Sequence, residues 1–366
     1  MTDRKNISLE ERDLRYAGRL AEMIRCRTVS KKDGFEAEEF LKLRQVIAAL
    51  FPMMTEKAEL TIFGDDAYLY KLKGRDESRN VMVMSHHEKK ICFDWIIDEG
   101  GAVIDPPMAG IDRKCAMMAV HEKGRCTAQL SAKNLPGHAG LEGGHKTPVM
   151  RMAEFMAEVD EKKPFIRKLH PEVRGMFEAM APHMSFPMGF IFSHLNLFSG
   201  LLIKMMPKLN AAAGEMLGTG CTFRKLSTDE KGNCVGEAFL RCINDADFAK
   251  DLDTLRELAE KHAVEITVRD EDNEYYRPAS LESGGYRYIK KTVEESFPYA
   301  AAVPFILPAG TDARHFSNLS DAVIRFAPID IDKQQYASVH GEDENISVDK
   351  LHLAVDFYKN LLVHYR

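Results

Sequence analysis

The chain has 366 residues, of which 45% are hydrophobic and 29% are charged. This composition is that of an ordinary globular protein, and it excludes a disulfide-stapled peptide and a disordered tail. Fifty Lys and Arg residues stand against 56 Asp and Glu residues, a net charge of -6. These charges are spread along the chain, so we expect a small ligand and no nucleic acid as partner. The length predicts two domains, one of which can interrupt the other.

The seven cysteines are scattered and include no CxxC pair. We therefore expect reduced, mostly buried thiols in a cytoplasmic protein. The best candidate for a membrane helix is the stretch 186–203, but Pro187, His194 and Asn196 interrupt it, and a span needs about 20 mostly apolar residues. We expect a helix, or two half-helices, packed inside a domain, and no membrane partner.

The N-terminal third predicts helices followed by buried strands. Ser8 and Glu11 have the spacing of a capping box, and apolar residues follow at helical spacing as far as Ile24. A second helix is expected over 36–51. The apolar runs 81–84 and 95–97 then predict strands buried on both faces, and each run ends in polar residues. Such strand ends are where α/β sheets place their chemistry.

After Ala116 the pattern becomes that of a separate α+β unit. It predicts a strand at 126–130, a Gly- and His-rich loop at 136–147, a helix at 148–159 and a strand-helix-strand stretch at 218–268. From Tyr276 the pattern is again α/β. The expected elements there are a helix at 286–296, an apolar run at 303–307 and a closing helix at 348–364.

Three polar clusters are candidates for a metal site. They are His86-His87-Glu88, Asp98-Glu99, and His340-Gly341 with Glu344 four residues after the histidine. Zinc binds neutral imidazoles and carboxylates readily. A single histidine at a strand end is more often structural than ligating. The clusters therefore predict a site only if one fold brings them together.

Several segments resemble the zinc-dependent aminoacylase/carboxypeptidase family. The run from Ala309 through Gly-Thr-Asp-Ala-Arg-His-Phe to Pro328, with Val-His-Gly-Glu-Asp-Glu-Asn-Ile-Ser after it, resembles the family's C-terminal signature. Segments 81–88, 93–104, 122–124 and 137–139 resemble further family motifs in the same order. The family includes acetylornithine deacetylase, succinyl-diaminopimelate desuccinylase, glutamate carboxypeptidase and carnosinase. The branch of vacuolar carboxypeptidase and N-acyl-amino-acid hydrolases looks most similar.

The resemblance implies a fold and a domain order. The fold is α/β, a catalytic α/β sandwich with a mixed sheet between helices and an inserted α+β lid or dimerisation domain. Residues 1–117 and 276–366 would form the two parts of the catalytic domain, and residues 118–275 would form the lid. The resemblance also implies a homodimer that associates through the lid.

The resemblance assigns metal-site roles to four residues. His86 and Asp98 match ligands of the first zinc ion, and His340 matches a ligand of the second. Glu88 stands where the family usually has an Asp that orients the first histidine. Glu keeps the charge but has a longer side chain, so it changes the hydrogen-bond geometry.

Two further residues match positions that contact the substrate. His138 matches a lid histidine that reaches the neighbouring active site in the dimer and polarises the scissile carbonyl. Arg314 matches a position whose guanidinium binds the substrate's carboxylate in two places. The implied substrate is a small peptide or an N-acyl amino acid with a free carboxylate.

One segment of the family pattern is missing. Only residues 89–93 lie between Glu88 and Asp94. At this place the family has a long segment that carries the metal-bridging Asp and the general-base Glu. We therefore expect at most one weak zinc site. The gap also predicts that strands 81–84 and 95–97 are not adjacent parallel partners, because a parallel crossover needs a dozen or more residues.

Three functions remain open on this pattern. The first is a metal-dependent hydrolase that cleaves a peptide or N-acyl amide next to a free carboxylate. The second is a dimeric relative that binds such compounds, or has a structural role, without catalysis, because loss of a general base costs about 10²–10⁴ in rate. The third is a deletion variant without activity.

Overall fold

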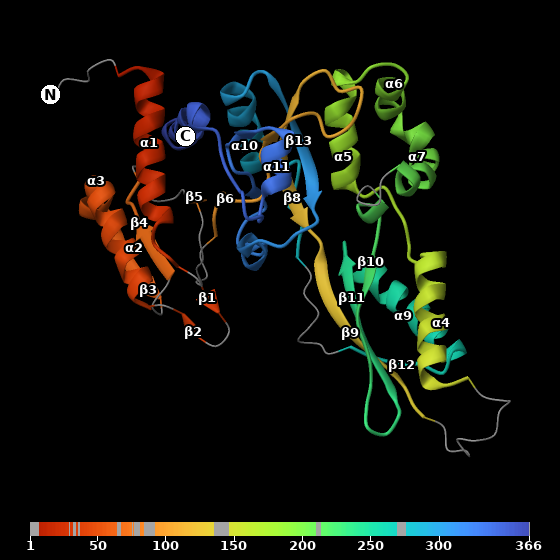
Figure 1. Ribbon diagram of the computed structural model, residues 1–366. Coiled ribbons are helices and arrows are strands. Elements are labelled where there is room, and N and C mark those ends of the chain that lie inside the picture. Colours follow the sequence, from red (N-terminus) through yellow and green to blue (C-terminus); the bar gives the residue numbers. More distant parts are fainter. Residues whose placement is uncertain are drawn as a thin grey trace.

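A computed structural model of the chain describes residues 7–28, 30–31, 34–35, 37–63, 67–74, 76, 81–83, 92–134, 146–209, 214–268 and 276–365. These residues form one large sheet, one small sheet and two short hairpins, with helices packed around them (Figure 1). In Figure 1 the small sheet lies below the large one, and the N-terminal helices lie on the far side from α5, α6 and α7.

The large sheet is mixed and has seven strands. Six follow the order β15-β7-β8-β14-β6-β5, and β13 also pairs with β8. The pairs β13–β8, β14–β6 and β15–β7 are parallel, whereas β7–β8 is antiparallel. The strand bounds are β5 Val81–Val83, β6 Trp95–Asp98, β7 Val103–Ile104, β8 Lys114–Glu122, β13 Ala300–Leu307, β14 Val323–Arg325 and β15 Asp330–Ile331.

Helices cover both faces of the large sheet. Successive side chains of a strand point to opposite faces, so neighbouring residues of one strand enter different cores. On β8, Ala116 and Met118 lie in the core that contains α10 and α12. Cys115 and Met117 lie in the core that contains α5, α6 and α7. The helix bounds are α5 Pro171–Met180, α6 Met188–Ser193, α7 Leu195–Leu209, α10 Gly284–Ser296 and α12 Leu351–Val363. This burial on both faces explains the continuous apolar run at 95–97. The expectation that strand 81–84 is buried on both faces is wrong, because β5 is an edge strand and Val83 is 49% exposed.

The small sheet has one covered face and a core of its own. Its order is β10-β11-β9-β12, and all of its pairs are antiparallel. On β9, residues Cys126, Ala128 and Leu130 point towards α4 and α9, and the residues between them are more exposed. The bounds are β9 Gly124–Ala132, β10 Gly220–Thr228, β11 Cys234–Cys242, β12 Glu265–Val268, α4 Pro148–Lys162 and α9 Asp245–Lys261. The expected fold class, a mixed α/β sandwich with a separate α+β unit, is confirmed.

The N-terminal helix begins as the sequence predicts. The Ser8 hydroxyl accepts a hydrogen bond from the Glu11 N–H at 3.2 Å. The helix is tied to α12 by Asp13, whose carboxylate accepts from the backbone N–H of His352 at 2.6 Å. This helix is α1, Leu9–Ile24. The elements that follow it are β1 Ser30–Lys31, β2 Gly34–Phe35, α2 Ala37–Leu50, α3 Pro52–Lys57, β3 Glu59–Phe63 and β4 Ala67–Lys71.

The prediction that the two apolar strands are not parallel neighbours is wrong. β5 pairs with β6 in parallel, with Val81 opposite Trp95 and Val83 opposite Ile97. The crossover rule applies to strands of ordinary length. A strand of three residues extends only about 10 Å, so the connection 84–94 is long enough to return to its start.

The stretch 186–203 forms two helices, α6 and α7, and the two-helix alternative is therefore confirmed. Their packing differs from the expectation. Phe192 and Leu202 are buried in the core that contains α5, but Phe186 and Leu197 are 83% and 76% exposed. Within the described residues, no helix has the length and apolar character to cross a membrane.

The two sheets are joined at a short junction where β8 runs into β9. The His121 Nε2–H donates to the carbonyl oxygen of Ile243, which follows β11, at 2.8 Å. Next to it, the buried Lys123 ammonium donates to the backbone oxygen of Glu215 at 2.6 Å. All seven cysteines are free, and five of them are buried, as expected.

The junction predicts a pH dependence of stability. Burial lowers the pKa of His121 to about 4, whereas an unfolded histidine titrates near 6.5. As the pH falls through this window, the unfolded chain binds a proton that the folded chain does not, so folding loses stability. Between pH 7 and pH 4.5 we expect His121→Gln to lose about 2 kcal/mol less free energy of unfolding than the unmodified chain. Urea denaturation at both pH values measures this difference, and equal losses would contradict it.

Candidate functional site

Three of the predicted site residues, His86, Glu88 and His138, lie outside the described residues, and their roles stay predictions. The other three, Asp98, Arg314 and His340, are described. The last two lie on connections that follow β13 and α11 (Lys333–Ser338). Within the described part of the chain, no hydrogen bond or ion pair joins these three side chains to one another.

Asp98 is the last residue of β6, and its side chain is almost completely buried. Its Oδ2 accepts a hydrogen bond from the backbone N–H of Ala313 at 3.0 Å. Burial raises the pKa of Asp98, against the opposing effects of the backbone N–H groups and the nearby Arg325 guanidinium. The carboxylate therefore has a structural partner, the turn that follows β13.

A second buried carboxylate, Glu122, holds the same turn. Its Oε2 accepts from the Thr311 N–H at 2.8 Å, and its Oε1 accepts from the Thr311 hydroxyl at 2.8 Å. The Arg325 Nε–H donates to Glu122 Oε1 at 2.7 Å. Glu122 and Arg325 are both almost inaccessible to solvent, so each charge depends on the other. Burial lowers the pKa of Arg325, and Glu122 opposes this effect.

The fixed turn presents Arg314. This residue lies in the short helix Asp312–Phe316, and its Nε–H donates to the Nε2 of His315 at 3.2 Å. A Cβ atom at Gly310 would lie 2.7 Å from Arg314 Nη1, so the glycine leaves room for the guanidinium. Among the described residues, no carboxylate lies within ion-pair distance of Arg314. Its guanidinium is thus available to an anionic ligand.

His340 lies on an exposed loop and has a positive φ of 63°. Its backbone N–H donates to Glu344 Oε2 at 3.3 Å. Glu344 thus contacts the backbone of the loop that carries His340. A positive φ is uncommon outside glycine, and His is among the side chains that tolerate it best.

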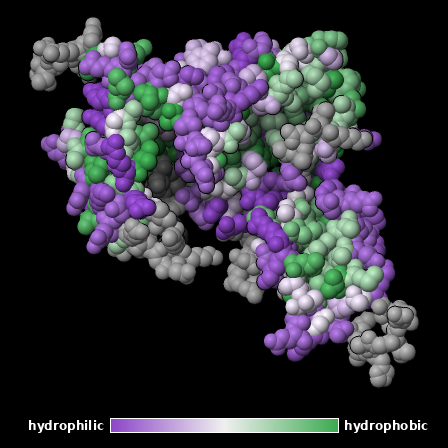
Figure 2. Space-filling model, viewed as in Figure 1, coloured by the Kyte–Doolittle hydropathy of each residue, from purple (hydrophilic) through white to green (hydrophobic). Residues whose placement is uncertain are grey.

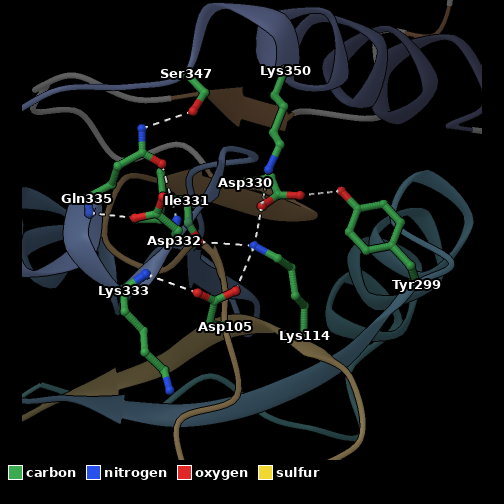
Figure 3. A network of polar contacts seen from close by, with 10 residues as sticks. All are labelled: Asp105, Lys114, Tyr299, Asp330, Ile331, Asp332, Lys333, Gln335, Ser347 and Lys350. Atoms are coloured by element: carbon green, nitrogen blue, oxygen red, sulfur yellow. Dashed lines mark hydrogen bonds and ion pairs between the residues drawn. The ribbon is translucent and has the colours of Figure 1, made fainter.

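A polar network centred on Asp330 anchors the chain before the His340 loop (Figure 3). The Asp330 carboxylate accepts from Lys114 Nζ at 2.6 Å and from the Tyr299 hydroxyl at 2.9 Å. Burial raises the pKa of Asp330, but Lys114, Tyr299 and Lys350 together hold it below its usual value. In α11, which follows, Asp332 caps the helix and exchanges hydrogen bonds with Gln335. Strands, helix and loop are thereby fixed to one another.

The described residues do not by themselves form a zinc site. No group of three His, Cys, Asp or Glu side chains within the described ranges is placed to hold a metal ion. Asp98 is engaged by the Ala313 amide, and His340 is exposed on its loop. Two protein ligands also fall short of the three that catalytic zinc sites usually have.

Sequence reasoning missed the two residues that organise this region, Glu122 and Arg325. Glu122 had been noted only as part of a family motif. Arg325 carried a signal, because it is a charged residue inside the apolar run 323–326 and strands buried on both faces rarely contain one. The sequence therefore indicates that Arg325 has a charged partner, but it does not indicate which residue that partner is.

A cavity of about 470 Å³ lies beside the junction of the two sheets. None of the predicted site residues lines it. Its wall consists of His121, His170, Pro171, Glu172, Ile243, Asn244, Asp245, Tyr276, Arg277, Pro278 and Asn318.

The buried pair predicts a large loss of stability. Glu122→Gln leaves Arg325 charged and buried, so we expect the free energy of unfolding to fall by about 3–5 kcal/mol in urea denaturation. Glu282→Gln is the matched control, since the Glu282 side chain is 91% exposed, and a change within about 0.5 kcal/mol is expected. Equal effects of the two substitutions would show that the buried pair is not important for stability.

The chain was compared with protein families, with curated proteins and with solved structures. No family model matches the chain. The chain is 26% identical over 274 residues to "N-fatty-acyl-amino acid synthase/hydrolase PM20D1" of Xenopus tropicalis, covering 73% of this chain and 53% of the relative. It is 25% identical over 279 residues to "Probable carboxypeptidase S-like 2" of Dictyostelium discoideum, covering 74% and 52%. The chain thus spans about half the length of these curated relatives.

A longer alignment and one solved structure extend this result. The chain is 21% identical to "Probable carboxypeptidase S-like 1" of Dictyostelium discoideum over 446 residues, covering 99% of this chain and 89% of the relative. Because 446 positions exceed the chain's 366 residues, this alignment contains gaps in the chain. In fold, the chain is similar to the dipeptidase Dug1p of Saccharomyces cerevisiae, with a TM-score of 0.52, 8% identity and coverage of 96% and 97%. The chain is thus similar to N-acyl-amino acid hydrolases and to carboxypeptidase S-like proteins, and these relatives support the resemblance to the aminoacylase/carboxypeptidase family.

Proposed function

We propose that this chain binds an N-acyl amino acid or a small peptide by its free carboxylate and hydrolyses the amide slowly or not at all. The observation that carries the proposal is the state of Arg314. Its guanidinium has no carboxylate partner among the described residues, and two buried carboxylates fix the turn that presents it. A fixed, unpaired guanidinium favours two-point binding of a carboxylate.

The substrate class is supported by the relatives. The Xenopus protein is named as a synthase/hydrolase of N-fatty-acyl amino acids, and the Dictyostelium proteins are named as carboxypeptidase-like. Compounds handled under both names contain an amide next to a free carboxylate. Arg314 supplies the chemistry that recognises this shared group.

Weak hydrolysis is proposed from the missing segment. Amide hydrolysis at neutral pH in this family needs metal-activated water and a carboxylate base. The segment that would carry the base and the bridging carboxylate has no counterpart between Glu88 and Asp94. Zinc would be held, at one weak site at most, by His86 and Asp98 in the proposed arrangement.

The family assignment supports three further proposals. The inserted domain lies within residues 118–275, where the small sheet with α4 and α9 has its own core, and two copies associate through it as a homodimer. His138 contacts the ligand of the neighbouring copy in that dimer. The protein is cytoplasmic, in keeping with its seven free thiols.

Binding tests the proposal through Arg314. We expect Arg314→Ala to raise the Kd of N-acyl amino acids and dipeptides by about 10- to 100-fold in isothermal titration calorimetry, because a charge-assisted hydrogen bond is lost. Ligands with a carboxamide in place of the carboxylate should bind the two proteins equally. The control is Arg287→Ala, which removes another exposed guanidinium, from α10. Unchanged affinity in Arg314→Ala would refute carboxylate binding at this residue.

Metal content and turnover test the proposal that the chain hydrolyses the amide slowly or not at all. After dialysis we expect at most one zinc ion per chain, and turnover below about 1 s⁻¹ on a panel of N-acyl amino acids and dipeptides, since ordinary enzymes lie above this rate. Two tightly held zinc ions together with faster turnover would establish a working hydrolase and overturn the proposal of weak activity.

A further inference from the structure

One exposed apolar surface is not explained by the proposed binding of small carboxylates. It lies on α6, on α7 and on the residue preceding them, and Figure 2 shows hydrophobic residues gathered over these helices. We call it the α6–α7 face, and its members are Phe186, Phe190, Leu197, Leu201 and Met205, which are 83%, 50%, 76%, 47% and 40% exposed.

The face is a continuous stripe because of helical spacing. Leu197, Leu201 and Met205 follow one another four residues apart and therefore lie on one side of α7. The opposite side, with Leu202 and Met206, is buried in the core that contains α5, α6 and one face of the large sheet. On α6 the Phe190 ring continues the stripe, 6.0 Å from the ring of Phe198 on α7.

The chain segment that forms the face carries charge of one sign. Residues 185–214 contain no Asp and no Glu, whereas Lys204 and Lys208 occur within them. Lys204 is exposed and lies at helical spacing from Leu197 and Leu201. On the neighbouring α5, Glu178 pairs with Arg174 at 3.7 Å, and Arg174 also donates to Asn196 Oδ1 at 3.1 Å. That carboxylate therefore has a cationic partner.

These features fit the surface of an anionic membrane better than a second copy of the chain. A helix with Leu and Phe on its outer side and Lys beside them is suited to lie in the interface of an anionic bilayer. α7 has 15 residues, about 22 Å in length, too short to span a bilayer but long enough to lie on it. A second copy docked face to face would bring the lysines of two segments without acidic residues together, which electrostatic repulsion disfavours.

We propose that the α6–α7 face binds the surface of anionic phospholipid membranes, with its aromatic and aliphatic side chains in the interface and Lys204 near the headgroups. The contact is peripheral and reversible, because the apolar stripe is short and its basic residues are few. It would hold the protein where amphiphilic compounds collect.

The full chain is tested by sedimentation with vesicles of phosphatidylcholine alone and with 30% phosphatidylserine. We expect binding to the anionic vesicles, a loss of about tenfold in the partition coefficient in 0.5 M NaCl, and weaker binding to neutral vesicles. Leu197→Glu combined with Leu201→Glu should lower the partition coefficient by about tenfold or more. Leu226→Glu is the matched control, since Leu226 is 49% exposed on β10 of the small sheet and should bind as the unmodified chain does.

Circular dichroism shows whether the double variant folds. If it does not, Lys204→Glu and Phe186→Ser replace it, because each changes a single exposed side chain. Absence of binding to anionic vesicles overturns the proposal, as does equal binding by the folded variants and the control. A dimer in sedimentation velocity that the variants dissociate, without vesicle binding, would assign the face to a second copy instead. Vesicle binding needs neither zinc nor turnover, so its failure would leave the proposed carboxylate binding unaffected.

Discussion

The ion pair between Glu122 and Arg325 is the constraint on which the rest of this structure depends. Each charge is buried, and a buried charge without a partner costs several kcal/mol. Glu122 ends β8 and Arg325 ends β14, so their pairing fixes two strand ends. The carboxylate also binds the N–H and the hydroxyl of Thr311. Through these contacts one side chain links the large sheet, the turn that carries Arg314 and the junction to the small sheet.

The ends of the strands beside Asp98 are held by contacts among the described residues. β5 pairs with β6 as the edge strand of the large sheet, and Asp98 at the end of β6 accepts a hydrogen bond from the Ala313 amide. The Asp330 network stabilises the His340 side independently, through contacts with Lys114 and Tyr299. The proposed ligand binding does not depend on the proposed hydrolysis, because the groups that fix the Arg314 turn are not those that the missing segment would supply.

Burial on both faces of the large sheet has a second consequence. α7 buries one side in the core that contains α5 and one face of the sheet, and its remaining apolar residues face outward. A contiguous exposed apolar patch usually marks an interaction site. The side of α7 that is left exposed by this packing forms part of the proposed membrane contact. The proposed carboxylate site at Arg314 lies on a different element.

The sequence by itself determined what depends on neighbouring residues: the Ser8 cap, the buried strand that ends at Asp98 and the order of the elements. These features rest on spacings of a few residues and on apolar runs, which are local. Only the tertiary structure decided the parallel pairing of β5 with β6, the outward side of α7 and the partner of Arg325. Arg325 and Glu122 are 203 positions apart, and the position of such a partner follows from strand order, which no local pattern specifies. Packing in three dimensions determined which charge neutralises which.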